Sequence, residues 1–165
     1  MRVIASGTFD RLHEGHKHFL REAAKRGFVM IAITSDEMLA QKRFAKLIYG
    51  YRRRRRDVVD FMESEGKSLG KDYLIRKIHD KYGFATKIKN VDAIVVTQET
   101  KKNAFFINRE REKKGWYPLD IIEINYVEDE KDIISSTRQR EKEFKIIEKL
   151  DEYRNNVMSA SRKYS

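Results

Sequence analysis

Short, almost uninterrupted apolar runs alternate with helical stretches along this chain, and this alternation does most to limit the folds open to it. The first run spans residues 2–6 and the second spans residues 28–34, and both are rich in β-branched residues. The stretch between them, residues 16–26, is typical of a helix and is closed by Gly27. Strands of this kind, separated by helices, form parallel sheets that are covered on both faces.

Further elements of the same two kinds follow along the chain. The pattern therefore predicts a doubly wound α/β fold, with a mostly parallel five-stranded sheet, helices on both faces and an additional C-terminal helix. This is a Rossmann-like arrangement. The additional strands are predicted at residues 73–79, 92–97 and 119–125, and the additional helices at residues 51–65, 100–114 and 138–153.

Length and composition fit one folded domain. The chain has 165 residues, of which 40% are hydrophobic and 38% charged, as in soluble globular proteins with a charged surface. We expect a single domain over residues 1–153 and a frayed tail over residues 154–165, which lack apolar periodicity. No window approaches the roughly 18 consecutive apolar residues of a membrane span, so a cytoplasmic location is expected.

The residue counts exclude several kinds of chemistry. There are no cysteines, so disulfide bonds, thiolate metal sites and a cysteine nucleophile are ruled out. Abundant Lys, Arg and Glu without Cys is typical of heat-adapted proteins. The formal net charge of +10 attracts anions, and it is equally consistent with nucleotide phosphates, polyphosphate and nucleic acid.

The loop after the first strand carries the strongest chemical signal. It reads Gly-Thr-Phe-Asp-Arg-Leu-His-Glu-Gly-His over residues 7–16, at the place where open parallel sheets usually bind phosphates. Gly7 permits a sharp exit from the strand, and Gly15 lets the backbone approach a ligand closely. We expect His13 and His16 to converge at a helix start and to stabilise the charge that builds up during attack on the α-phosphorus of a nucleotide.

Two other interpretations of these histidines are weaker. Zinc is disfavoured, because the metalloprotease pattern places histidines four apart on a helix, whereas His13 and His16 are three apart with Gly15 between them. Incidental surface histidines would be the default for isolated residues, but they do not explain the whole string after a strand. The loop therefore favours a nucleotidyltransferase that joins a nucleoside triphosphate to a phosphate-bearing substrate.

A second motif, Ile-Ser-Ser-Thr-Arg-Gln-Arg, spans residues 134–140. Ser-Ser-Thr at the start of a helix would offer hydroxyls and free N–H groups to the β- and γ-phosphates. Together with His-x-Gly-His, this motif resembles the signature of the cytidylyltransferase-like superfamily of nucleotidyltransferases. Segments at residues 34–39, 80–83 and 107–111 are most similar to its archaeal-type phosphopantetheine adenylyltransferases, and the resemblance covers roughly residues 1–140.

The resemblance implies transfer of AMP from ATP, with Mg²⁺ as cofactor, to 4′-phosphopantetheine by direct in-line attack without a covalent intermediate. It also implies roles for individual residues, and none of them is a metal ligand. For the catalytic lysine, Lys46 is an alternative to Lys42, because it lies one helical turn away. The implied catalytic residues are His13, His16 and Lys42; the substrate-binding residues are Thr8, Asp10 and Arg54; the nucleotide-binding residues are Gly7, Phe9, Gly15, Glu99, Asn108, Arg111, Ser135, Ser136, Thr137 and Arg140.

Other functions stay open at this point. The nearer rivals use another acceptor, as glycerol-3-phosphate cytidylyltransferase and FMN adenylyltransferase do. A basic nucleic-acid-binding module is the rival from a different class, supported by the net charge and by five arginines at residues 52–56 beside Tyr49 and Tyr51. Five consecutive helical residues point in all directions, so most of this run is expected to be solvated. We therefore expect neither nucleic acid nor membrane as a partner, and a monomer is favoured.

Overall fold

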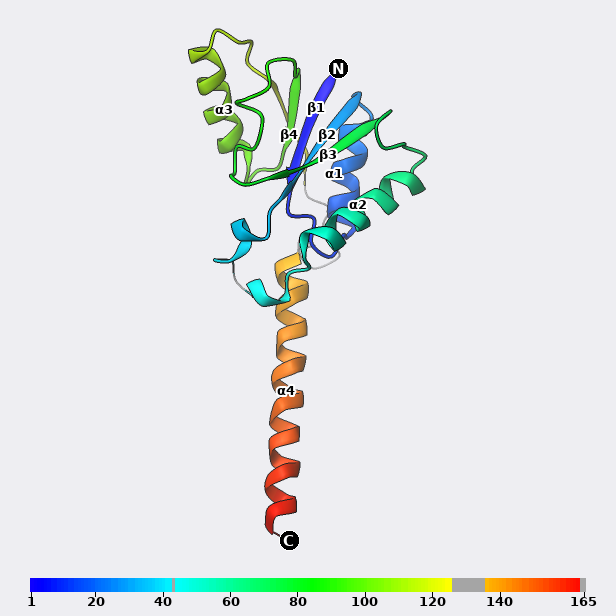
Figure 1. Cartoon of the computed structure of the whole chain (residues 1–165), viewed down its shortest axis with the longest axis vertical. Coiled ribbons are helices and arrows are strands. Elements are labelled where there is room, and N and C mark those ends of the chain that lie inside the picture. Colours follow the sequence, from blue (N-terminus) through cyan, green and yellow to red (C-terminus); the bar gives the residue numbers. More distant parts are fainter. Residues whose placement is uncertain (43, 126–135, 164–165) are drawn as a thin grey trace.

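Five parallel strands form one sheet in the order β3-β2-β1-β4-β5. The structure is a computed structural model, shown in Figure 1, and it describes residues 1–42, 44–125 and 136–163. The strands are β1 (Arg2–Gly7), β2 (Phe28–Thr34), β3 (Tyr73–Ile78), β4 (Ala93–Val96) and β5 (Asp120–Glu123); the helices are α1 (Glu14–Ala24), α2 (Tyr51–Ser64), α3 (Lys101–Lys113) and α4 (Ser136–Lys163), with short 3₁₀ helices η1 (Glu37–Leu39) and η2 (Ala45–Leu47).

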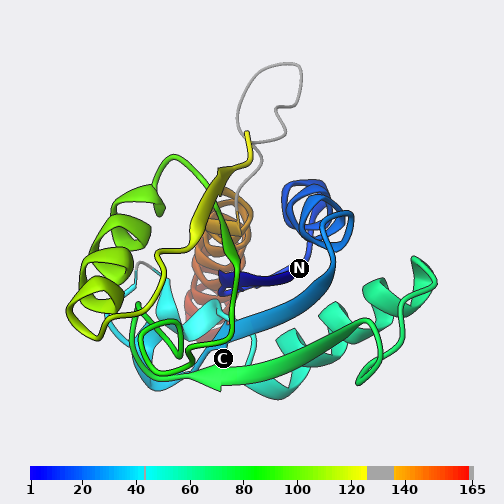
Figure 2. The same ribbon diagram turned by 90° about the horizontal axis from the view of Figure 1, so that it is seen from above.

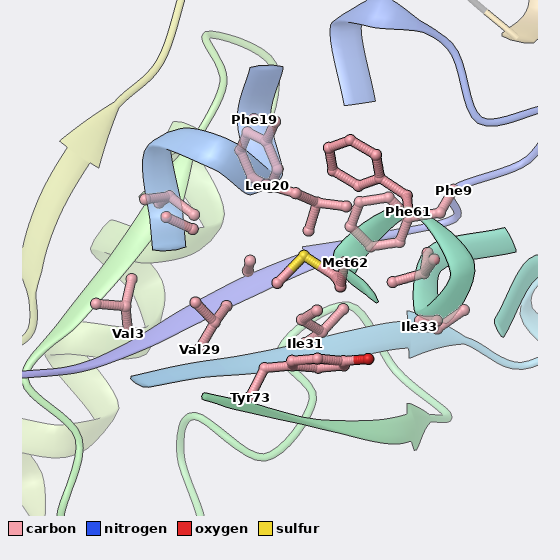
Figure 3. Packing of buried hydrophobic residues seen from close by; sticks show 14 of the residues in the cluster. Val3, Phe9, Phe19, Leu20, Val29, Ile31, Ile33, Phe61, Met62 and Tyr73 are labelled. Carbon is pink, nitrogen blue, oxygen red and sulfur yellow. The ribbon is translucent and has the colours of Figure 1, made fainter. Parts of the chain in front are cut away.

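Alternate residues of the central strands supply two separate cores. On β2, Val29, Ile31 and Ile33 face α1 and α2, where they pack near Leu20 and Phe61 (Figure 3). The intervening β2 residues join the second core with α3, on the opposite face of the sheet (Figure 2). Burying one such aliphatic side chain stabilises the fold by about 1.5–3 kcal/mol. The predicted doubly wound α/β fold is confirmed.

The turn between α1 and β2 fixes where these two elements meet. Gly27 has a φ of 145°, and a Cβ there would lie 2.3 Å from the carbonyl oxygen of Met1, so the position needs glycine. The next residue, Phe28, donates its N–H to the same oxygen at 3.0 Å. This contact sets the register in which Gly7 pairs with Ile33, and β1 and β2 therefore end at the same edge of the sheet.

Helix α4 departs most from the sequence-based expectation. The prediction of a frayed tail is wrong over residues 154–163, because α4 continues to Lys163. No glycine or proline interrupts this segment, and each added residue of a growing helix gains one hydrogen bond, so the helix has no local reason to stop. Figure 1 shows α4 projecting from the α/β body. None of the described helices is long and apolar enough to cross a membrane.

Candidate active site

A cavity of about 790 Å³ opens beyond the carboxyl ends of β1, β2 and β4. Neighbouring strands β1 and β4 begin crossovers in opposite directions, which is where doubly wound sheets bind ligands. Most of the predicted site residues meet here. Those that line the cavity are Gly7, Thr8, Phe9, Asp10, His13, Gly15, His16, Lys42, Glu99 and Arg140.

The loop after β1 has an unusual backbone. Phe9 and Arg11 have φ values of 53° and 47°, in the left-handed region that side chains other than glycine rarely adopt. The Phe9 ring is buried in the core, and a Cβ on Gly7 would lie 3.0 Å from it. A strained backbone conformation of this kind is stable only where the surrounding structure fixes it. For Phe9, the packing of its ring in the core does this.

The two histidines form a capping box at the start of α1. The backbone N–H of Gly15 donates to His13 Nδ1 at 3.0 Å, and the N–H of His13 donates to His16 Nδ1 at 3.4 Å. The rings stack with centroids 3.9 Å apart. Because each Nδ1 accepts a hydrogen bond, both imidazoles are assigned as neutral with their proton on Nε2.

The surroundings keep both imidazoles neutral. Burial, and next the proximity of His13, lower the pKa of His16 to about 3. Burial also lowers the pKa of His13. At physiological pH the pair therefore offers N–H donors without a full charge, and an arriving phosphate would supply the negative charge that stabilises imidazolium.

Lys42 brings a cation to the same cavity. Its Nζ donates to Thr8 Oγ1 at 3.2 Å, and Thr34 Oγ1 donates to the same hydroxyl at 3.3 Å. Although Lys42 is exposed overall, partial desolvation of its ammonium group by the cavity walls, and next the charge of Arg140, lower the pKa of Lys42. Lys46 does not line the cavity, so Lys42 is the better-placed lysine.

The buried carboxylate of Asp10 connects the loop to two other segments. It accepts hydrogen bonds from Arg140 at 2.5 Å, from Arg11 at 2.8 Å and from the backbone N–H of Tyr49 at 2.9 Å. Asp10 is fully buried and Arg140 is 2% exposed, so the two charges compensate each other. The pair holds the first turns of α4 against the cavity.

The structure places Arg54, which was predicted to bind the substrate, outside the set of residues that line the cavity. Its fully buried guanidinium donates to the carbonyl oxygens of Thr8 at 2.9 Å and Thr34 at 2.8 Å, which lie at the ends of β1 and β2. It also bonds the Tyr49 carbonyl and forms an ion pair with Asp36. Arg54 does not line the cavity, because these partners occupy its donors.

The two residues predicted on α3 also lie away from the cavity. Arg111 donates to the carbonyl oxygens of residues 85, 88, 89 and 117 at 2.7–2.9 Å. The Asn108 amide pairs with both backbone groups of Leu119, just before β5. These contacts fasten loops to α3, and neither of the two residues lines the cavity. Ser135 lies outside the described residues, as do the side chains of Ser136 and Thr137.

Several cavity residues were not predicted from the sequence. Lys81, Thr97 and Asn125 follow β3, β4 and β5, respectively, and all three line the cavity. The rule that parallel sheets bind ligands at their carboxyl edge could have identified them. Asn103, in the first turn of α3, also lines the cavity and carried no such signal. Within the described part of the chain, no three His, Asp or Glu side chains gather into a metal-binding group.

The fold and site together define a nucleotide-binding α/β domain, with a histidine loop at the phosphate position of a doubly wound sheet. The Cytidylyltransferase-like family model matches residues 4–142, and the chain belongs to this family.

Similar proteins of known name point to one branch of this family. A phosphopantetheine adenylyltransferase of Thermococcus kodakarensis is 48% identical over 74% of this chain and 73% of its own length. One from Pyrococcus furiosus is 46% identical over 74% of this chain and 76% of its own length. A crystal structure of an Archaeoglobus fulgidus protein of unknown function is 30% identical, with a TM-score of 0.66 over 75% of this chain and 89% of that one. The resemblance seen in the sequence is confirmed.

Proposed function

We propose that this chain transfers AMP from ATP to 4′-phosphopantetheine, giving dephospho-coenzyme A and pyrophosphate. The observation that carries this function is the 48% identity, over 74% of this chain, to a relative named phosphopantetheine adenylyltransferase. The histidine loop of this chain also lines the cavity described above. We propose a cytoplasmic location for this reaction, which uses two small soluble substrates.

The transfer needs no covalent enzyme intermediate. A phosphate oxygen of phosphopantetheine attacks the α-phosphorus of ATP, forming a new P–O–P bond while the bond to the β-phosphate breaks and pyrophosphate leaves. The attacking phosphate is already deprotonated at neutral pH, so no general base is required. Catalysis of this kind depends on holding the two phosphates in line and stabilising the charge on the α-phosphate oxygens.

Different cavity residues stabilise the different phosphates. The Nε2–H groups of His13 and His16 donate to the α-phosphate oxygens, as preorganised donors that gain strength as charge develops. Lys42 lowers the repulsion between the attacking phosphate and the α-phosphate. Arg140, fixed by Asp10, provides a cation for the outer phosphates.

One carboxylate among the described cavity residues is placed to contact Mg²⁺ that would arrive bound to ATP. Asp10 and Glu99 are the carboxylates among the described lining residues, and Asp10 is already paired with two arginines. Mg²⁺ commonly binds substrate phosphates together with one or two carboxylates and keeps several waters. We therefore assign Glu99 as the protein carboxylate available to it; the bound ion supplies charge neutralisation of the triphosphate.

Pyrophosphate release tests this function. The chain is assayed with ATP or CTP against 4′-phosphopantetheine, glycerol 3-phosphate and FMN. We expect release with ATP and 4′-phosphopantetheine alone. A His16→Ala variant purified in the same way should lose two or more orders of magnitude in turnover, about the loss expected for one preorganised donor, while circular dichroism stays unchanged. Release only with CTP, or only with FMN as acceptor, would refute the proposed acceptor and donor.

A further inference from the structure

Helix α4 leaves the α/β body soon after it begins. Arg140 and Glu143 form ion pairs with Asp10 and Arg11, and the Phe144 ring lies 5.0 Å from the Phe44 ring. From residue 144 to residue 162 every side chain is exposed. At 1.5 Å per residue, this exposed part is about 27 Å long. Figure 1 shows it as a straight stalk beyond the body.

One side of this stalk is apolar. Ile146, Leu150, Tyr153 and Val157 are 59%, 61%, 71% and 48% exposed, and Ala160 continues the same spacing of four and three residues. This is the heptad spacing of a coiled-coil seam, which brings such residues onto one stripe of a helix. A contiguous exposed stripe of large apolar side chains is typical of a surface that another chain covers.

We propose that this stripe is the interface of a homodimer in which two α4 helices pair antiparallel. The seam is self-complementary in that direction: Leu150 packs on the partner's Tyr153, and Ile146 packs on the partner's Val157. A two-fold axis then passes between residues 151 and 152, as expected for a closed pair of identical surfaces. The two α/β bodies lie at opposite ends of the paired helices.

The charges that flank the stripe select this direction. In a parallel pair Lys149 would lie beside the partner's Arg154, a repulsive contact between flanking positions of the heptad. In the antiparallel pair Lys149 lies on the same flank as the partner's Glu152. On the other flank, Asp151 lies near the partner's Arg154. The antiparallel pair therefore avoids the close contact between two cations that the parallel arrangement makes. This interface depends on α4 alone and not on the proposed function.

Sedimentation velocity on the full chain, from about 1 to 300 µM, tests the interface. We expect the mass to rise from the 19.7 kDa of one chain towards twice that value. Leu150→Lys should raise the dissociation constant by about two orders of magnitude, because it places a charge in the seam. Asn155→Lys adds the same charge on the opposite side of the helix and should leave association unchanged.

Charge reversal tests the direction. Lys149→Glu should weaken the antiparallel dimer about tenfold, and the double variant Lys149→Glu with Glu152→Lys should restore it. A parallel dimer would instead be strengthened by Lys149→Glu, because the new carboxylate would meet the partner's Arg154. That result would overturn the antiparallel arrangement.

Other results would overturn the interface itself. A wild-type chain that stays at 19.7 kDa throughout the range would do so, as would equal effects of Leu150→Lys and Asn155→Lys. A monomer that co-sediments with anionic lipid vesicles would identify a membrane surface as the partner of the stripe. Pyrophosphate release by Leu150→Lys should equal that of the wild type, since this part of α4 lies outside the cavity. Pyrophosphate release tests the proposed function and sedimentation tests the dimer, so a negative result for one proposal does not affect the other.

Discussion

His13 and His16 serve the fold and the site through different atoms of the same rings. Each Nδ1 accepts a backbone hydrogen bond at the start of α1, which satisfies donors that a helix end leaves free. That arrangement fixes the tautomer and leaves Nε2–H available to a ligand. The catalytic and structural contributions of a histidine can therefore be separated by a substitution. The new side chain should replace the acceptor Nδ1 but not the donor Nε2–H.

Substitutions at His13 make this separation measurable. Asparagine is a good N-cap and can accept from the Gly15 N–H, whereas alanine cannot. We expect His13→Ala to lose about 1 kcal/mol of unfolding free energy and His13→Asn to lose less than about half of that. Turnover should fall about a hundredfold in both, because both lack the Nε2–H donor. Urea unfolding and pyrophosphate release measure the two effects; wild-type turnover in His13→Asn would contradict the assigned donor.

The low pKa of His16 predicts a stability that depends on pH. In the unfolded chain His16 takes up a proton near its ordinary pKa of 6.5, while in the folded chain burial lowers this pKa to about 3. The unfolded state therefore binds more protons below pH 6.5, and stability falls as the pH drops from 6.5 towards 3. Between pH 7.5 and 5.0 the loss should be about 1 kcal/mol, discounted for partial exposure of the ring.

Urea unfolding of wild type and His16→Ala at the two pH values checks this. Carboxylates contribute similarly to both proteins, so the difference between them isolates His16. An equal loss in the variant would show that His16 is not held neutral.

The roles of arginines were the hardest to predict at the level of single residues. The resemblance implied that Arg54 binds the substrate and that Arg140 binds the nucleotide, but only Arg140 lines the cavity. Arg54 is held by carbonyl groups 46 and 20 residues away along the chain. An arginine that binds phosphate and one that binds backbone oxygens use the same donors, so the distinction requires the packed fold. The positions of the glycines and histidines in the first loop were easier to predict from the sequence, because their spacing within one turn determines their geometry.

At the level of elements, apolar patterning located each strand to within about two residues, because a strand buried on both faces admits few polar residues. The 3₁₀ helices η1 and η2 carry no comparable pattern and were not predicted. The first turns of α4 form part of the site although they lie 130 residues from Asp10 in sequence. Only the folded chain shows that the Asp10 carboxylate joins them to the first loop.

Removal of the charge on Asp10 tests this connection. Asp10→Asn can still accept from the Tyr49 N–H but no longer forms the ion pair that positions Arg140 and the first turns of α4, so we expect the KM for ATP to rise about tenfold. The KM for 4′-phosphopantetheine should change less than about threefold, because Lys42 and Thr8 are untouched. Glu143→Gln, which removes the ion pair between α4 and Arg11 outside the cavity, is the matched control and should leave both values near wild type. Equal increases in both KM values for Asp10→Asn would indicate general loosening of the loop instead.

For the molecule as a whole, the net charge of +10 surrounds the cavity that we propose to bind ATP and a second phosphate-bearing substrate. The arginines at 52–56 do not act as one unit: Arg54 is buried, Arg53 lies 3.8 Å from the centre of the Tyr49 ring, and Arg52 and Arg56 are exposed. The exposed members contribute to the field of the whole protein. Such a field raises the encounter rate of charged substrates and is screened by salt, with a Debye length of about 8 Å at physiological ionic strength.

We therefore expect kcat/KM for ATP to fall roughly three- to tenfold between about 20 and 300 mM NaCl, while kcat changes little, because screening acts on encounter and not on the buried pairs of the site. The double variant Arg52→Gln and Arg56→Gln should start lower than wild type at low salt and converge with it at high salt. Steady-state kinetics at fixed free Mg²⁺ measure both effects. If kcat/KM is independent of salt, the net charge does not steer ATP; if the two proteins differ equally at all salt concentrations, the exposed arginines contact the substrate directly.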